Sequence, residues 1–160
     1  MDKNEAMIKF LMTCPTIQNN PLFFNFAEAE NGNNHFITEH DVKKKTYIDG
    51  STLKQYTFSI ASYSSVSHNA IADDDVAGEI LFDANIDNMA KVQSILDWIN
   101  EQADNHNFPD FGTDCEVDSM ETLTTDPDID GIDTSVNPPI ARYSVGVKLI
   151  YLDNSKKLWN

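Results

Sequence analysis

The strongest constraint on the fold is an alternating run near the C-terminus, from Ile140 to Leu152. Bulky apolar side chains occupy every second position there, namely Tyr143, Val145, Val147, Leu149 and Tyr151. A strand points successive side chains to opposite faces, so this period of two predicts a long strand with one buried face. The run from Leu53 to Tyr63 shows the same pattern, with Tyr56, Phe58 and Ile60 on one side. The chain must therefore build a sheet that is buried on one face.

Two segments have helical spacing instead. Met7, Phe10, Leu11 and Cys14 recur at i, i+3, i+4 and i+7, and Pro15 predicts the end of this short helix. A longer helix is predicted to begin with Asn85 as its N-cap and to run to about His106. Its apolar stripe comprises Ile86, Met89, Val92, Leu96, Ile99 and Ala103.

Weaker strand patterns lie at residues 22–26, 36–37, 46–48 and 115–124. Because short turns rather than crossover helices join the strands, we expect an α+β fold with a mainly antiparallel sheet and two amphipathic helices packed on one face, in the order α-βββ-α-ββ. Residues 1–160 are expected to form a single domain, with a surface excursion at 64–83 and an acidic loop between strands at 126–139. The predicted core comprises Met7, Phe10, Leu11, Phe24, Tyr56, Phe58, Ile60, Met89, Val92, Leu96, Ile99, Val145, Val147 and Leu149.

The chain is strongly acidic, with 26 acidic and 11 basic residues and a formal net charge of −15. Such a surface repels phosphate backbones, and the one basic run, Lys43-Lys44-Lys45, is predicted to be a solvated loop. No segment has the apolar length of a signal peptide or membrane span. Cys14 and Cys115 lack the spacing of a zinc site and are expected to be reduced thiols.

No pattern of residues predicts catalysis. A GxSxG or HExxH motif is missing, the histidines lie among polar neighbours, and the glycines are scattered, so we expect no enzyme, no catalytic residue and no cofactor. Residues 126–131 match the opening of a calcium loop, D-x-D-x-D-G. Asn137 stands where the bidentate Glu belongs, so Asp126, Asp128 and Asp130 are predicted to lie in a solvated loop without a metal.

Several stretches together carry a resemblance that covers nearly the whole chain. They are Thr13-Cys14-Pro15, Asn20 to Phe26, Asp49-Gly50-Ser51, Lys54 to Phe58, Asp97-Trp98-Ile99, Phe108 to Gly112, Gly131 to Ser135 and Ala141-Arg142-Tyr143. The set resembles small proteins of the head-to-tail joining and tail region of phages and prophages that infect Gram-positive bacteria. Within that group the chain is most similar to tail terminators, also called tail completion proteins.

The resemblance implies a tail-terminator-like fold and a structural virion protein. Its hexameric ring would cap the tail tube, end tube growth and present a surface for head joining. The implied partners are other copies of the chain, the tail tube protein, head-tail connector proteins and the sheath where a tail has one. DNA would pass without specific binding, and no membrane is involved. The implied location is the tail or neck of the virion, after assembly in the host bacterial cytoplasm.

The charge imbalance adds an expectation about assembly. Acidic copies repel one another unless the few cations lie near the contacts. The interface candidates are therefore Lys43, Lys44, Lys45, Lys54, Arg142 and Lys148, with Asp73, Asp74 and Asp75 as acidic counterparts. Two alternatives stay open, namely another head-tail connector or minor capsid protein, and a soluble acidic binding module that depends on calcium.

Overall fold

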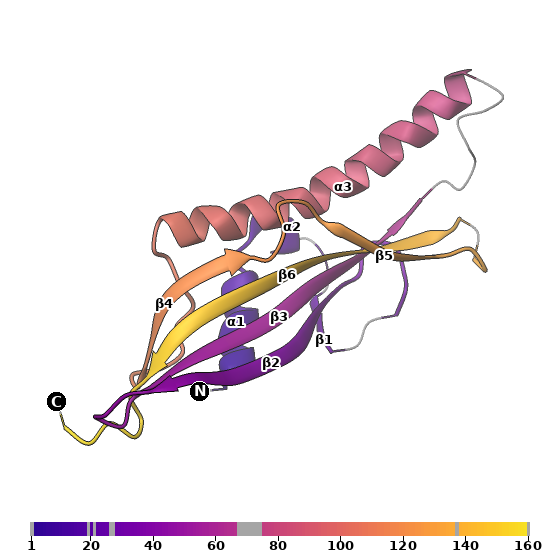
Figure 1. Ribbon diagram of the computed structural model, residues 1–160. Coiled ribbons are helices and arrows are strands. Elements are labelled where there is room, and N and C mark those ends of the chain that lie inside the picture. Colours follow the sequence, from indigo (N-terminus) through magenta and orange to yellow (C-terminus); the bar gives the residue numbers. More distant parts are fainter. Residues whose placement is uncertain are drawn as a thin grey trace.

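The computed structural model describes residues 2–18, 20, 22–25, 28–66, 75–136 and 138–159, with the backbone alone for residues 75–86 (Figure 1). The fold is α+β and contains a mixed sheet of six strands. The elements in chain order are α1 (Lys3–Leu11), α2 (Pro15–Gln18), β1 (Leu22–Phe24), β2 (Asn34–Thr46), β3 (Thr52–Ser65), α3 (Asp75–Asp104), β4 (Cys115–Thr122), β5 (Asp128–Asp133) and β6 (Ile140–Asp153).

The sheet is built around the antiparallel pair β3 and β6, which have 14 residues each. The strand order is β1-β2-β3-β6-β4, and β5 pairs with the part of β6 that β4 leaves free. β1 runs parallel to β2, whereas every other pair is antiparallel. The two alternating runs in the sequence therefore do form the long strands that the period of two predicts.

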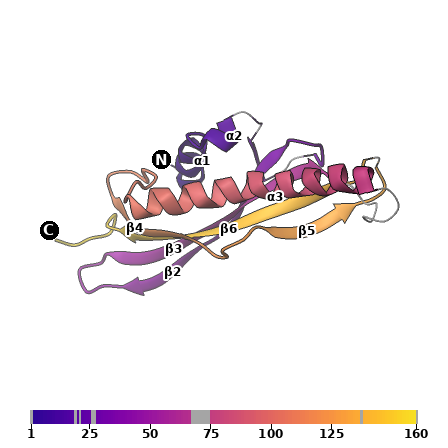
Figure 2. The same cartoon turned by 90° about the horizontal axis from the view of Figure 1, so that it is seen from above.

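One face of β3 and β6 carries the core. Phe58 lies opposite Val147 and Ile60 opposite Val145, and all of these side chains are buried. Figure 2 shows the helices on one side of the sheet, and their buried side chains belong to the same cluster. The helices contribute Ala6, Met7, Leu11, Ile17, Val92, Ile95, Leu96 and Ile99. The opposite face has no helix over it in the described part of the chain, so one sheet face stays open (Figure 2).

Three expectations about local structure were wrong. Asn85 does not cap the long helix, because α3 begins at Asp75, ten residues earlier than predicted, and no proline interrupts the segment between them. The excursion expected at 64–83 is smaller, since 64–65 belong to β3 and 75–83 to α3, while 67–74 lie outside the described residues. Phe24 is 49% exposed, because β1 is a short strand at the sheet edge, although its ring stacks on Phe36.

Two further segments expected as loops are strands. Residues 128–133 form β5 within the expected acidic loop, because they pair along β6 through a register shift between Ile129 and Gly131. Extended backbone rises by about 3.3 Å per residue, so Asp128 and Asp130 are drawn out along β5 and do not wrap around one point as the ligands of a calcium loop do. Lys43, Lys44 and Lys45 lie in the second half of β2, which joins the two weak strand patterns into one strand.

Candidate assembly surface

The second half of β2 is a sheet edge with exposed lysines. β1 covers only Asn34 to Phe36, so β3 is the only strand that pairs with residues 38–46 within the described chain. At the start of this stretch the Thr38 N–H donates to Asn25 Oδ1. Lys43, Lys44 and Lys45 are exposed, and none of them forms an ion pair with a described carboxylate. Lysines on an open strand discourage unspecific pairing with other strands. We refer to residues 38–46 as the basic edge.

The other predicted cations are engaged within their own chain. Lys54 Nζ lies 2.8 Å from Asp153 Oδ2, and Lys148 Nζ lies 2.5 Å from Glu121 Oε1. Arg142 Nη1 lies 3.3 Å from Asp130 Oδ2. These three side chains neutralise carboxylates across the sheet, which leaves the lysines of the basic edge as the members of the predicted set without an ion pair among the described residues. Lys45 Nζ lies over the ring of Tyr47, 5.0 Å from its centroid.

The acidic counterparts proposed from the sequence fall where the structure does not describe side chains. Asp73 and Asp74 lie outside the described residues, and of Asp75 only the backbone, at the start of α3, is described. A different acidic surface lies on the far side of the sheet. β4 carries the exposed residues Glu116, Asp118 and Glu121, and only Glu121 among them has a described cation partner. We refer to β4, residues 115–122, as the acidic edge.

The open face is hollowed between these two edges. A hollow of about 530 Å³ is lined by Tyr47, Ser51, Leu53, Glu116, Asp118 and Leu152. Its lining combines apolar side chains with two carboxylates, which suits contact with a protein surface that offers apolar and basic groups. Near this end of the sheet, Ile48, Leu158 and Trp159 are also exposed. The C-terminal segment after β6 is bound to the β2–β3 turn, where the Leu158 N–H donates to the Asp49 carbonyl oxygen.

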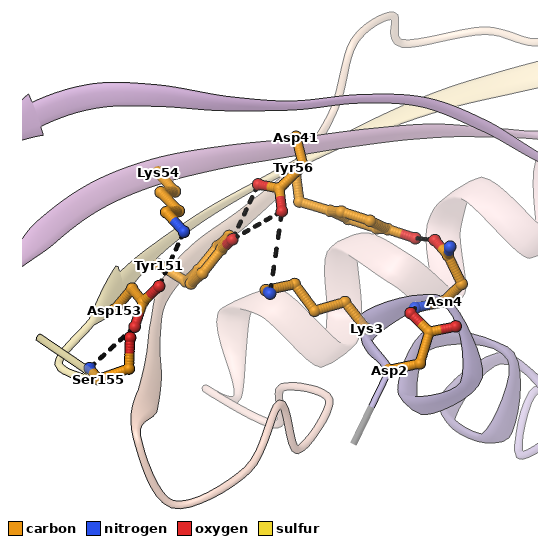
Figure 3. A network of polar contacts seen from close by, with 9 residues as sticks. All are labelled: Asp2, Lys3, Asn4, Asp41, Lys54, Tyr56, Tyr151, Asp153 and Ser155. Atoms are coloured by element: carbon orange, nitrogen blue, oxygen red, sulfur yellow. Dashed lines mark hydrogen bonds and ion pairs between the residues drawn. The ribbon is translucent and has the colours of Figure 1, made fainter.

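A polar network ties α1 to the sheet beside the basic edge (Figure 3). The Tyr151 hydroxyl donates to Asp41, 2.8 Å from Oδ1, and Lys3 Nζ lies 3.9 Å from the same carboxylate. Tyr56 donates its hydroxyl hydrogen bond to Asn4 Oδ1. Burial, reinforced by Asp41, raises the pKa of Tyr151 well above its ordinary value, so the phenol stays protonated and serves as a donor.

The same network extends to the end of β6. The hydrogen bond from Lys54, together with those from Ser155, holds the pKa of Asp153 below its ordinary value. The pKa of Lys54 is raised for the same reason. These groups fix the shape of the sheet from which the basic edge projects.

The described residues contain no group of three or more His, Cys, Asp or Glu side chains placed to hold a metal ion. Cys14 is buried and Cys115 is partly buried, and both are free thiols. Burial raises the pKa of Cys115, which disfavours the reactive thiolate. Trp98 is partly buried, and its ring centroid lies 5.2 Å from that of Phe10.

Neither a protein-family model nor a curated protein sequence matches this chain. Among the described helices, none is long and apolar enough to cross a membrane. The surface features above are therefore the basis for the function proposed next.

Proposed function

We propose that this chain is a ring-forming structural protein of a phage tail, of the tail-terminator type. The observation that carries the proposal is a sheet covered by helices on one face and left open at two edges of opposite charge. A protein with two different, complementary edges associates head to tail, and such contacts close into rings when the rotation between copies permits.

The stretches that carry the resemblance have structural roles here. In Asp49-Gly50-Ser51, the Asp49 carboxylate accepts hydrogen bonds from the N–H and hydroxyl of Ser51 and closes the β2–β3 turn. In the segment from Phe108 to Gly112, Phe111 is buried against Tyr56 and Tyr151. These stretches stabilise the turn and the core that hold the sheet in shape, which is consistent with a protein that acts by assembling with other proteins. We propose a structural and not a catalytic role.

The proposed partners are further copies of this chain, the last ring of the tail tube and the head-tail connector, with the tail or neck of the virion as location. The net charge of −15 suits a conduit along which DNA moves without adhering. A hexameric ring with a terminator-like fold is the form that the resemblance implies. The open sheet face, with its apolar hollow, is the surface we assign to contacts outside the ring.

The test is electron microscopy of tails assembled in cells that lack this protein. We expect tubes of uncontrolled length that do not join heads, and restoration of normal length when the intact gene is supplied. Tails of normal length that join heads normally would contradict the proposal.

The calcium-dependent alternative has a separate test. A ligand that binds only the native state raises the melting temperature. The extended course of β5 separates the acidic side chains, so we expect calcium to leave the melting temperature unchanged. A rise that saturates with calcium concentration, and is lost in Asp128→Asn/Asp130→Asn, would favour the binding module.

A further inference from the structure

The basic and acidic edges match in length and position. The free part of β2 and all of β4 lie at the same end of the sheet, because β1 and β5 occupy the other end. Cross-strand pairing links Thr38 through Phe58 and Val147 to Thr122. At the other limit it links Thr46 to Cys115 through Thr52 and Asp153. Residues linked in this way form one row across the sheet. The Thr38 N–H already donates to Asn25 Oδ1, so the free edge of β2 runs from His40 to Thr46 and spans the same rows as residues 115–121 of β4.

The directions of the strands also suit a joint between copies. β2, β3, β6 and β4 alternate in direction, because each adjacent pair is antiparallel. β2 and β4 of one copy therefore run in opposite directions. A second copy related by rotation about an axis along the strands keeps these directions, so its β2 meets β4 of the first copy as an antiparallel partner.

The side chains at the two ends of each row complement one another. The row that crosses the open face at the hollow runs from Lys45 through Leu53 and Leu152 to Glu116. Another open-face row begins at His40 and ends at Glu121. The remaining rows, given by their two ends, are Thr46 and Cys115, Lys43 and Val117, Val42 and Ser119, Asp41 and Met120, and Thr38 and Thr122. No paired row in this stretch brings like charges together when its ends meet. Glu39 lies at the register shift between Thr38 and His40, so its carboxylate falls between the rows that end at Thr122 and Glu121 and opposes the charge match there.

The register shifts add a further match. Lys44 lies at the shift in β2 between Lys43 and Lys45, and Asp118 lies at the shift in β4 between Val117 and Ser119. Both are exposed, and neither forms an ion pair within the described chain. Opposite charges on facing strands favour pairing, and like charges oppose it.

We propose that copies of this chain join by continuing the sheet, the basic edge of β2 in one copy pairing antiparallel with the acidic edge of β4 in the next. Lys45 of one copy meets Glu116 of its neighbour, and Lys44 lies near Asp118. The inference rests on the proposed function, in that it takes the chain to be ring-forming. It adds which strands make the joint and in which direction they run.

Two charge-reversed variants test the joint. Lys44→Glu/Lys45→Glu makes both edges acidic, and Glu116→Lys/Asp118→Lys makes both edges basic. Each variant alone is expected to lose association roughly tenfold or more, measured by mass photometry and native mass spectrometry. Mixed in equal amounts, the two variants are expected to regain it, because the reversed edges of each now complement those of the other.

A control variant separates the joint from total charge. Glu28→Lys/Glu30→Lys changes the net charge as much as Glu116→Lys/Asp118→Lys does, but at exposed positions in the segment before β2. It is expected to associate like the unaltered chain. Far-UV circular dichroism and thermal melts of all variants establish that each is folded.

A second measurement identifies the contact directly. A carbodiimide joins a lysine amine to a carboxylate without a spacer, and mixing copies labelled with different nitrogen isotopes distinguishes links between chains from links within one. We expect inter-chain links from Lys44 or Lys45 to Glu116 or Asp118. Rings that survive both reversals, or a chain that stays monomeric at high concentration and gives no such link, would overturn the joint. Rings that depend on these edges but neither bind tails nor limit their length would overturn the proposed function and leave the joint standing.

Discussion

Leu96 offers the sharpest test of how the helices pack on the sheet. It lies in the middle of the described side chains of α3 and is 1% exposed. Val92, Ile95 and Ile99 on the same helix are equally buried, so the side chains around Leu96 have little freedom to fill a gap. We expect Leu96→Ala to lower the free energy of unfolding by about 2–5 kcal/mol, from lost burial and the cavity left behind.

The assay is equilibrium unfolding in urea, with the slope checked to be unchanged. For a chain of this size the melting temperature should fall by about 2–4 °C for each kcal/mol lost. Glu101→Ala, at an exposed position of the same helix, is the matched control and should change stability by less than about 0.5 kcal/mol. A loss below about 1 kcal/mol for Leu96→Ala would mean that α3 presents a different face to the sheet.

Three other predictions follow from single contacts. Tyr151→Phe removes the hydroxyl that donates to Asp41 and should cost about 1–3 kcal/mol in urea unfolding, since the carboxylate loses a partly buried partner. Gly50→Ala should lower the melting temperature more than Gly112→Ala does. Both glycines have positive φ, but a Cβ at Gly50 would lie 2.3 Å from the backbone carbonyl oxygen of Lys156, whereas a Cβ at Gly112 would have open space around it. Asp153 has a folded-state pKa below its ordinary value of 3.8. Its contribution to stability is therefore fully present above pH 3.8 and is lost as the pH falls through the lower folded-state pKa. Asp153→Asn should flatten the decline in unfolding free energy between about pH 5 and about pH 2.

The long central strands could be predicted because burial on one face leaves a period of two in the sequence. Tyr56, Phe58 and Ile60 are buried as expected, and so are Val145 and Val147. The core side of the helices was predictable for the same reason, with a period near 3.6. These patterns show which side chains are buried, and each can be recognised within a single segment of the sequence.

The edges of the sheet could not be predicted in this way. An edge strand beyond the helices has polar residues on both faces, so the second half of β2 has the composition of a loop. Every residue of β5 is exposed, and the segment becomes a strand only through its pairing with β6. The start of α3 at Asp75 was missed because Asn85 is also a suitable capping residue.

The candidate site was predictable only in its cation set. Which lysines are free depends on cross-strand neighbours, and the sequence does not give register. Lys148 lies opposite Glu121, and Arg142 lies beside the register shift that carries Asp130. These pairs remove Lys148 and Arg142 from the free cations and leave the basic edge. The acidic edge was missed because its carboxylates alternate with apolar residues and form no run.

The proposed joint places two electrostatic effects in opposition, and their ranges differ. Each copy carries a net charge of −15, so whole copies repel one another over the Debye length. That length is about 30 Å at 0.01 M salt but only about 8 Å at 0.15 M. The contacts of Lys45 with Glu116 act at a few ångströms and are screened much less at that concentration. Moderate salt should therefore remove the repulsion before it weakens the joint.

We accordingly expect association to be strongest at intermediate ionic strength and weaker at both limits, measured by sedimentation velocity across about 0.01–1 M sodium chloride. The Lys44→Glu/Lys45→Glu variant should lose this maximum, because it keeps the repulsion and lacks the attraction. If association of the unaltered chain fell steadily from the lowest salt, repulsion between whole copies would be unimportant. If it instead rose steadily to molar salt, the contact would be apolar and would centre on the hollow at Tyr47 and Leu53 and not on the charged edges.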